Sequence, residues 1–398
     1  MHARIIAVLL FILSFLQPTF SQVPSKGENM EIAIMTLGPY QGELYSAFGH
    51  SAIRIVDTTR NFDYVFNYGV FNFNQDNFYW NFARGKMLYQ LGLAKYDRFV
   101  NHYINENRYV IEQYLNLTPA EKAQLNDYLF ENYKPENREY YYNYVYNNCS
   151  SKIMDVLRDA IDREVTFSYD YVEEGISVRD LMDKYLAYQP WGDWVIDIGL
   201  GMQIDGVAAP ETYMFLPDYV EKSLAKATIA TDSSAAPLLS KTVNVYTPTP
   251  EEHANSMFTP FNTFVIIFFI VGFITNRDFK KGKRSHWIDV VFFTFVGIIG
   301  WWVAFLWIGT EHLSKNNLNI LWATPLHIPF IYLLNVARFR KFISKYFLAC
   351  AILYLVVLVI WGLIPQPLHM AMIPIMLTMI LRAFFIYHDV NRTGSKGF

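Results

Sequence analysis

The chain has 398 residues, enough for two domains that each bury a core. Hydrophobic residues make up 53% of it and charged residues 17%, whereas roughly 25% of an ordinary soluble domain is charged. The long apolar stretches all follow residue 257, which predicts an integral membrane protein, and the formal net charge of -3 excludes a general attraction to nucleic acid.

The N-terminus has the pattern of a secretory signal peptide, predicted over residues 1–22. His2 and Arg4 precede the apolar run 5–16, and small or polar residues follow at 19–22. An uncleaved anchor is the alternative, but the apolar run is short for a membrane span. Under either interpretation the following residues are delivered outside the cytoplasm.

Residues 30–225 are predicted to form one α+β domain. Runs of β-branched and aromatic residues bounded by turn residues predict its strands. They cover 31–37, 50–56, 62–68, 87–93 and 109–115. The polar turn 57–61 joins the second and third of these strands as a hairpin.

Two helices of this domain have clear starts. Thr118, Pro119 and Glu121 supply an N-cap, a proline at the first helical position and a capping box. This pattern predicts a helix over 118–133. A second helix is predicted to begin at Asn148, because the apolar residues after it recur at helical spacing.

Residues 226–256 are rich in Ala, Ser, Thr and Pro and are predicted to be a surface linker with one strand candidate at 242–246. Residues 257–398 are predicted to form an all-α bundle of about five transmembrane helices. They are placed at 258–275, 287–309, 319–336, 346–364 and 368–386.

The loops between these segments give their orientation. Lysine and arginine gather in the first and third loops and in the C-terminal tail, whereas the second and fourth loops carry little positive charge. Because basic loops stay in the cytoplasm, the α+β domain is predicted to face the periplasm. The chain is therefore predicted to be a multi-pass protein of the inner membrane.

The chain has only two cysteines, Cys149 and Cys350. Cys350 falls in the fourth predicted span near its cytoplasmic end, so it is interpreted as a small packing residue that cannot pair with Cys149. Cys149 is then an unpaired thiol in an oxidising compartment. Such a compartment gives little reason to keep a purely structural thiol, which favours a chemical role.

Cys149 lies in the first turn of the helix predicted to start at Asn148. Free amide groups and the helix dipole stabilise a thiolate there, and such positions lower a thiol pKa to roughly 3.5–7.5. His50 begins a predicted strand after a glycine and is the best candidate for a base that exchanges protons with the thiol. Other histidines fit less well, because His102 and His253 have a polar, loop-like sequence context while His312 and His327 belong to the membrane half. An unrelated cysteine and histidine remain the alternative.

A thiol site of this kind also needs a residue that orients the imidazole and a donor for the oxyanion. Asp63 is predicted to orient His50, with Asn67 as the second choice, because both share a face of the hairpin with it. A surface aspartate is an equally good interpretation of Asp63. The Asn148 side chain and the Cys149 backbone N–H are the predicted oxyanion donors.

Polar and aromatic residues gather at the predicted periplasmic ends of the second and third membrane helices. We predict that they hold a lipid headgroup, although the cluster is largely interfacial. The residues are His312, Asn316, Asn319, Trp322 and His327. No metal site and no cofactor are predicted, because the chain has no HExxH, no CxxC, no Walker-type loop and no GxGxxG on a strand–helix turn.

Four segments carry a family resemblance. They are GELYSAFGHSAIRI, FDYVFNYGVFNF, YNYVYNNCSSKI and YMFLPDYV. They are similar to the Lnb-type N-terminal periplasmic domain of membrane proteins described as lipoprotein N-acyltransferases. The order of a histidine strand, a polar residue and "NC" at a helix start also resembles the circularly permuted papain-like group, which includes lecithin:retinol acyltransferase-like enzymes.

The resemblance implies a papain-like periplasmic domain with Cys149 as the acyl carrier, His50 as the base and Asp63 as the third residue. It implies a lipoprotein N-acyltransferase. The acyl chain would pass from a membrane phospholipid, through a cysteine thioester, to the α-amine of the lipidated N-terminal cysteine of a lipoprotein. Two alternatives stay open at this point: a membrane-anchored periplasmic cysteine peptidase or amidase of the cell wall, and a non-catalytic envelope scaffold.

Overall fold

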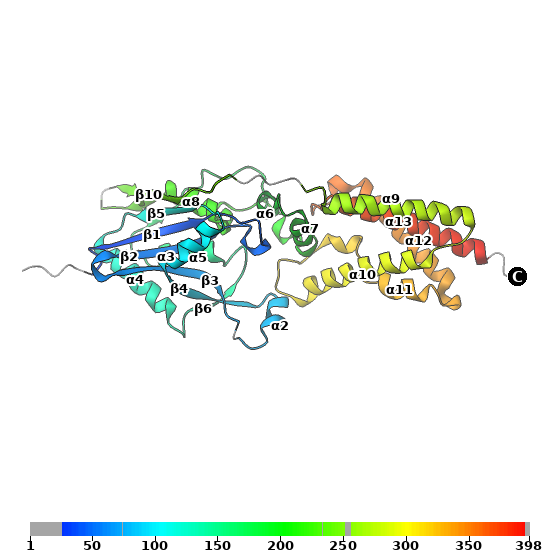
Figure 1. Ribbon diagram of the computed structural model, residues 1–398, viewed down its shortest axis with the longest axis horizontal. Helices are drawn as coiled ribbons and strands as arrows, with labels where there is room; N and C mark the ends of the chain where they lie inside the picture. The colour runs from blue at the N-terminus through cyan, green and yellow to red at the C-terminus, as the bar shows by residue number, and fades with distance from the viewer. Residues whose placement is uncertain (1–25, 74, 233, 251–255, 395–398) are drawn as a thin grey trace, which may run out of the picture.

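The computed structural model describes residues 26–394, except 74, 233 and 251–255. Its α+β part and its helical part lie at opposite ends of an elongated molecule (Figure 1). This arrangement confirms the predicted fold class of an α+β domain followed by a membrane bundle. The predicted signal peptide falls outside the described residues.

A seven-stranded antiparallel sheet forms the centre of the α+β domain, in the order β10-β5-β1-β2-β3-β4-β6. Its strands are β1 (Met30–Leu37), β2 (His50–Asp57), β3 (Phe62–Phe71), β4 (Met87–Lys95), β5 (Val110–Leu115), β6 (Glu139–Tyr142) and β10 (Leu239–Tyr246). The five predicted strands and the β2–β3 hairpin are confirmed. Asp57 closes that hairpin by accepting the N–H groups of Thr59 and Arg60.

Strand β10 confirms the strand candidate at 242–246, but the rest of the predicted linker needs a correction. Residues 226–256 contain β8 (Thr228–Ala230), β9 (Ala235–Pro237) and β10, which pairs with β5 at the edge of the main sheet. Strands β8 and β9 join β7 (Val165–Thr166) in a small second sheet. Most side chains of β10 are exposed, so its composition is polar like that of a loop and its strand pattern is weak.

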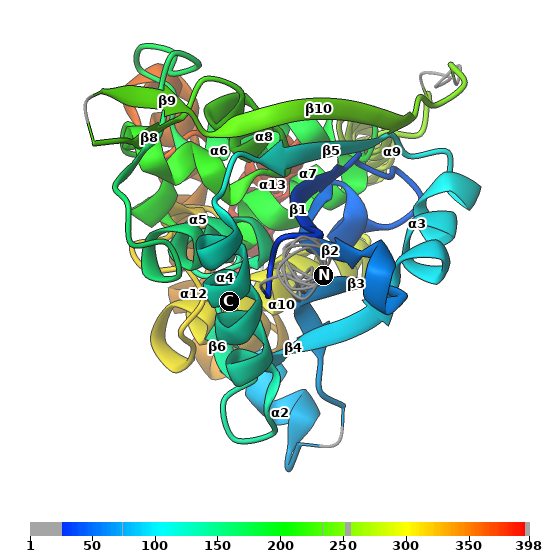
Figure 2. The same cartoon turned by 90° about the vertical axis from the view of Figure 1, so that its left-hand side faces the viewer.

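The helices of the domain are α2 (Phe78–Ala83), α3 (Tyr96–Asn105), α4 (Pro119–Tyr133), α5 (Cys149–Asp159), α6 (Val178–Leu186), α7 (Pro190–Gly199) and α8 (Pro217–Ala225). Helices α3, α4, α5 and α8 pack on the main sheet. Figure 2 shows α3 on one side of the sheet and α4 with α5 on the other. The predicted helix starts at Thr118 and Asn148 are confirmed, each with a complete capping box.

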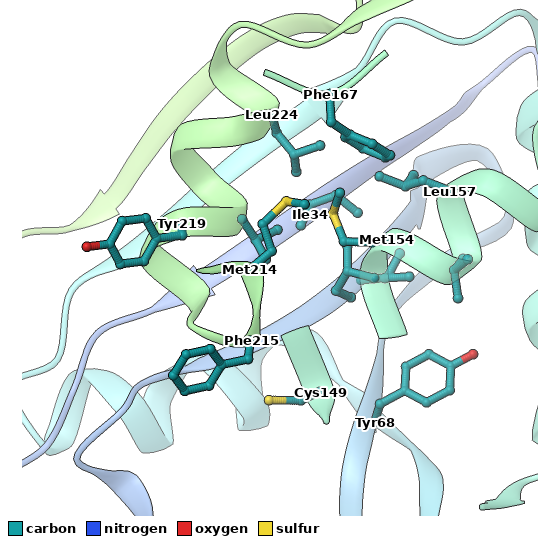
Figure 3. Packing of buried hydrophobic residues seen from close by; sticks show 14 of the residues in the cluster. Ile34, Tyr68, Cys149, Met154, Leu157, Phe167, Met214, Phe215, Tyr219 and Leu224 are labelled. Carbon is teal, nitrogen blue, oxygen red and sulfur yellow. The ribbon is translucent and has the colours of Figure 1, made fainter. Parts of the chain in front are cut away.

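The larger core of the domain lies between the sheet and the helices α4, α5 and α8. Met154 and Leu157 of α5 pack there beside Ile34 of β1 and Leu224 of α8 (Figure 3). Cys149 lies at the margin of the same cluster, beside Phe215 in this view. The core therefore fixes the start of α5 against the sheet.

The membrane half contains four helices that are long and apolar enough to cross a bilayer, among the described residues. They are α9 (Pro260–Lys281), α10 (His286–Gly309), α12 (Ala337–Val359) and α13 (Met372–Gly394). Four of the five predicted spans thus correspond to continuous helices, with boundaries shifted by a few residues.

The predicted third span, 319–336, is not a continuous helix. It forms the 3-10 turn η5 (Leu318–Leu321) and the short helix α11 (His327–Leu333), interrupted near Pro325, which cannot continue a helical hydrogen-bond ladder. The segment packs very closely on α10, since a Cβ at Gly300 would lie 2.2 Å from the Ala323 carbonyl oxygen. Hydropathy alone does not show this interruption, because it counts apolar residues and not backbone contacts.

Candidate active site

Cys149 is the first residue of α5, and the cap in front of it is built by Asn148. The Asn148 Oδ1 atom accepts the N–H groups of Ser150 and Ser151, each at 2.9 Å. The Ser151 hydroxyl accepts the Asn148 N–H at 2.8 Å, which completes the capping box. The thiol thus lies at the positive end of a well-capped helix, where a negative charge is stabilised.

Cys149 is only 8% exposed. Burial raises the pKa of the thiol, but the charge of His50 and its hydrogen bond outweigh burial. The Ser51 N–H and the Ser150 hydroxyl contribute further, and the pKa falls to about 7. A substantial fraction of thiolate at neutral pH follows.

His50 is the first residue of β2, at the end of the sheet that faces Cys149. Its Nε2 atom lies 2.5 Å from Oδ1 of Asn67, so Nδ1 is the ring nitrogen left to exchange a proton with the thiol. The imidazole lies parallel to the Tyr103 ring, with 6.3 Å between the ring centres. Burial lowers the His50 pKa, but the Cys149 charge, its hydrogen bond and the Asn67 oxygen raise it above its ordinary value.

Asp63 does not contact His50, which corrects the predicted third residue. Its carboxylate takes two hydrogen bonds from the Arg54 guanidinium, at 2.9 and 2.8 Å. Asp63 and Asn67 do share a face of the hairpin with His50, as predicted. However, Asp63 is four residues further along β3, about 13 Å at the rise of a strand. Asn67, the second choice, occupies the position beside the imidazole.

This geometry predicts different effects for substitutions at Asn67 and at Asp63. We expect Asn67→Ala to slow alkylation of Cys149 by iodoacetamide at pH 7 several-fold, because the imidazole loses its fixed orientation. Asp63→Ala should leave that rate unchanged while lowering the midpoint of thermal unfolding, because Arg54 loses a partner. Equal slowing in both variants would contradict the assignment of Asn67.

Gly69 of β3 lies directly against the pair and was not recognised in the sequence. Its φ is +93°, and a Cβ there would lie 3.6 Å from Cys149 Cβ and 3.9 Å from His50 Cε1. The β3–β4 register shifts between Asn67 and Val70, so Gly69 lies in a β-bulge, which only a residue tolerant of positive φ accommodates easily. The bulge brings β3 close enough to position Asn67 and to contact Cys149.

The Asn148 side chain is not free to stabilise an oxyanion, contrary to the prediction. Its Nδ2 atom donates to the carbonyl oxygens of Tyr144 at 3.0 Å and Phe215 at 2.7 Å. Asn148 therefore has a structural role in fixing the helix start. The Cys149 backbone N–H remains available, since the first residues of a helix have no intrahelical acceptor.

The predicted headgroup cluster is divided between two environments. His312 packs against Gly85 after α2, and its side chain bonds to the backbone of Phe82 and Ala83. Asn316 is exposed and has a φ of 56°, a value typical of asparagine in a turn. Neither residue forms a pocket with the other members of the cluster.

Asn319, Trp322 and His327 are fully or almost fully buried, so the prediction of an open headgroup site is wrong for them. Asn319 Nδ2 donates to the Asp197 carbonyl oxygen at 3.0 Å, and Trp322 Nε1 donates to Asn319 Oδ1 at 2.8 Å. His327 lies between the hydroxyls of Tyr346 and Tyr354, at 3.0 and 2.7 Å.

The same region joins the two halves of the molecule. Asn317 Nδ2 donates to the Ile198 carbonyl oxygen at 2.7 Å, and Gln366 Nε2 donates to that of Leu200 at 3.0 Å. Together with the bond from Asn319, these side chains of the membrane half satisfy the carbonyl groups left free at the end of α7. We call this set of contacts the junction.

A cluster of three carboxylates has a spacing suited to a metal ion, among the described residues. Oxygens of Asp183, Asp193 and Asp197 lie within 4.8 Å of one another. Arg179 pairs with Asp197 at 2.6 Å, and His369 Nε2 lies 3.5 Å from Asp193. The cluster belongs to this ion-pair network between α6, α7 and the bundle, and not to the site of Cys149.

The pKa of Cys149 gives a testable pH dependence. At pH 7 about half of Cys149 should be thiolate, given its pKa of about 7, against about 3% for a thiol with the ordinary pKa of about 8.5. Since only the thiolate is alkylated, the rate with iodoacetamide should rise with pH through an inflection near 7. The Cys149→Ala variant corrects for reaction at Cys350. An inflection at or above 8.5 would contradict the pair.

Comparisons with known proteins cover most of the chain. Residues 18–183 match the family described as the Lnb N-terminal periplasmic domain, and residues 252–393 match the family described as the Lnb transmembrane domain. No curated protein and no solved structure matches the chain. The two matches follow each other in the order of the two structural halves. The chain therefore belongs to the Lnb family.

Proposed function

We propose that the protein is a thiol-dependent lipoprotein N-acyltransferase of the inner membrane, with its α+β domain in the periplasm. One observation carries the proposal: Cys149, at the capped start of α5, and His50, which Asn67 holds, lie against the same glycine, Gly69, and the charge of His50 lowers the pKa of the thiol. A thiolate beside an imidazolium is the activated nucleophile of acyl transfer. Family membership supports an enzyme of lipoprotein N-acylation in a membrane protein with a periplasmic domain.

In the first step the Cys149 thiolate attacks the ester carbonyl carbon of a phospholipid. A C–S bond forms, the bond from the carbonyl carbon to the glycerol oxygen breaks, and the protonated His50 gives its proton to the leaving oxygen. The products are an acyl thioester on Cys149 and a lysophospholipid. The Cys149 N–H would stabilise the oxyanion of this step.

In the second step the α-amine of the lipidated N-terminal cysteine of a lipoprotein attacks the thioester. A C–N bond forms, the C–S bond breaks, and neutral His50 accepts a proton from the amine. The departing thiolate and the new imidazolium restore the starting ion pair. Asn67 keeps the imidazole oriented in both steps, because its Oδ1 atom accepts a hydrogen bond from the Nε2–H group of His50.

A wall peptidase or amidase would use the same pair of side chains, but its substrate would need an open polar cleft. The surroundings of Cys149 favour a lipid instead. Cys149 is 8% exposed, and aromatic rings lie close to the pair. Tyr103 lies parallel to the His50 imidazole, and the Tyr142 ring and Cys149 both lie within 4 Å of the position that a Cβ at Gly69 would take. The junction also holds this domain at the membrane.

The thioester provides the direct test. Full-length protein in phospholipid nanodiscs should gain the mass of one acyl chain on Cys149, and the adduct should disappear when a synthetic diacylated lipopeptide with a free α-amine is added. The Cys149→Ala variant controls for acylation elsewhere. An adduct-free protein that still N-acylates the lipopeptide would overturn the mechanism.

A further inference from the structure

The segment around α2 presents large aromatic side chains to solvent. The exposed fractions are 70% for Phe73, 86% for Tyr79, 58% for Trp80 and 44% for Phe82. Soluble surfaces seldom gather such residues without a partner, and tryptophan and tyrosine are enriched where a membrane meets water. This part of the domain is therefore built to contact an amphipathic partner.

Contacts with α10 fix the position of α2 relative to the bundle. The Glu311 N–H donates to the Arg84 carbonyl oxygen at 2.8 Å, and Lys86 lies 3.4 Å from the Glu311 carboxylate. The Trp80 ring centre lies 6.5 Å from that of Phe305 in the last turns of α10. Figure 1 shows α2 projecting sideways from the domain next to the start of the bundle. The exposed rings thus lie where a membrane-spanning helix leaves the bilayer.

A continuous series of ring contacts leads inward from α2. The ring centres of Phe78 and Phe73 are 5.1 Å apart, and those of Phe73 and Phe71 are 5.5 Å apart. The Phe71 and Tyr89 rings follow at 4.4 Å, and the Tyr89 and Tyr142 rings at 4.1 Å. We call these five residues the aromatic row.

The inner end of the aromatic row reaches the active pair. A Cβ at Gly69 would lie 3.8 Å from the Tyr142 ring and 3.6 Å from Cys149 Cβ. Because Gly69 has no side chain, the Tyr142 ring and Cys149 border the same small space. The outer end of the aromatic row, Phe73 and Phe78, lies in the exposed aromatic surface around α2. The row connects that surface to the sulfur.

We propose that the aromatic row is the track by which a phospholipid acyl chain reaches Cys149 from the outer leaflet of the membrane. The ester carbonyl would lie at the sulfur, with the chain extending back over the rings toward the bilayer. Ring faces offer an apolar surface without buried polar groups along the chain, and the chain itself excludes water from the thioester. The catalytic purpose of the track rests on the proposed function, whereas the lipid contact does not.

Photo-crosslinking tests the track without catalysis. The full-length Cys149→Ala variant in nanodiscs of phosphatidylethanolamine carrying a diazirine on the acyl chain should be labelled on Tyr89 and Tyr142, as mapped by mass spectrometry of peptides. Combining Phe73→Ser, Tyr79→Ser and Trp80→Ser should lower this labelling at least tenfold. These side chains are exposed, so the variant should fold normally.

A matched control is available in β6. Tyr141 is 67% exposed and leaves the strand on the face opposite Tyr142, because successive side chains alternate. Tyr141→Ser should keep the labelling within twofold. Absence of label from the row, or equal labelling in the triple variant, would overturn the track.

The same nanodiscs separate the two proposals when Cys149 is intact. An acyl adduct on Cys149 without label on the row would support the transferase and overturn the track. Label on the row without any adduct would support the lipid contact and overturn the transferase. In the native protein we expect both the acyl adduct on Cys149 and the label on the aromatic row. In the triple variant we expect the rate of Cys149 acylation to be at least tenfold lower.

Discussion

Cells that carry only the Cys149→Ala variant are expected to produce lipoproteins without an amide-linked acyl chain. Removal of a covalent nucleophile costs an enzyme up to about 10⁶-fold in turnover, because the thioester cannot form. Mass spectrometry of the N-terminal lipopeptides should show the diacyl form in place of the triacyl form. A lipoprotein of known mass serves as the reporter.

The control for this result is the folded state of the variant. Cys149 borders the core of the domain, and alanine removes only the sulfur atom, so the variant should reach the membrane in normal amount. Cys149→Ser keeps the shape of the side chain but is a far weaker nucleophile, and it should be equally inactive. N-acylation at the native level in either variant would refute the mechanism.

His50→Ala is expected to lower N-acylation by about 10²–10⁴-fold, the usual contribution of a general acid–base group. Two losses combine in this variant. The thiol pKa should rise, because burial then acts without the compensating charge of the imidazole, and the amine has no proton acceptor in the second step. Initial rates with phospholipid nanodiscs and a diacylated lipopeptide measure the effect.

The pH profile of this variant distinguishes a catalytic histidine from a structural one. At pH 9 a large part of the Cys149 thiols of His50→Ala should ionise, so alkylation by iodoacetamide should recover toward the native rate. N-acylation should recover less, since the general base is still missing. A variant whose alkylation rate at pH 7 equals that of the native protein would show that His50 does not activate the thiol.

Local patterns in the sequence were sufficient to predict the elements that carry the active pair. The apolar spacing that follows Asn148 and the alternation that begins at His50 depend on neighbours within a few residues. The strands, the two helix starts and the choice of Cys149 and His50 as candidates follow from them. The resemblance to the Lnb domain rested on the same segments, and the family is shown.

The residue that orients His50 could not be identified from strand periodicity, because the two candidates differ only in their distance along the strand. Asp63 and Asn67 are equivalent in strand periodicity, and charge made Asp63 the more attractive choice. The structure separates them because Arg54 binds the carboxylate of Asp63 while the hairpin register brings Asn67 to His50. Gly69 gave a signal, a glycine within a strand pattern, that indicates a bulge or a close backbone approach.

Errors in the membrane half have a different origin. Asn319 and Trp322 have the composition of an interfacial lipid site. However, Asn319 donates to the backbone of Asp197, far away in the sequence, and Trp322 donates to Asn319. The third span has enough apolar residues for a helix, and its interruption depends on packing against Gly300 of α10. Neither tertiary contact leaves a periodic pattern in the segment itself.

The junction determines how far the reacting sulfur can travel. Its hydrogen bonds fasten the end of α7 to the bundle through Asn317, Asn319 and Gln366, so the periplasmic half cannot swing freely like a tethered soluble enzyme. Cys149 is thereby held at one position relative to the bundle. Under the proposed function, donor and acceptor are both confined to the same leaflet and would meet it by lateral diffusion in two dimensions.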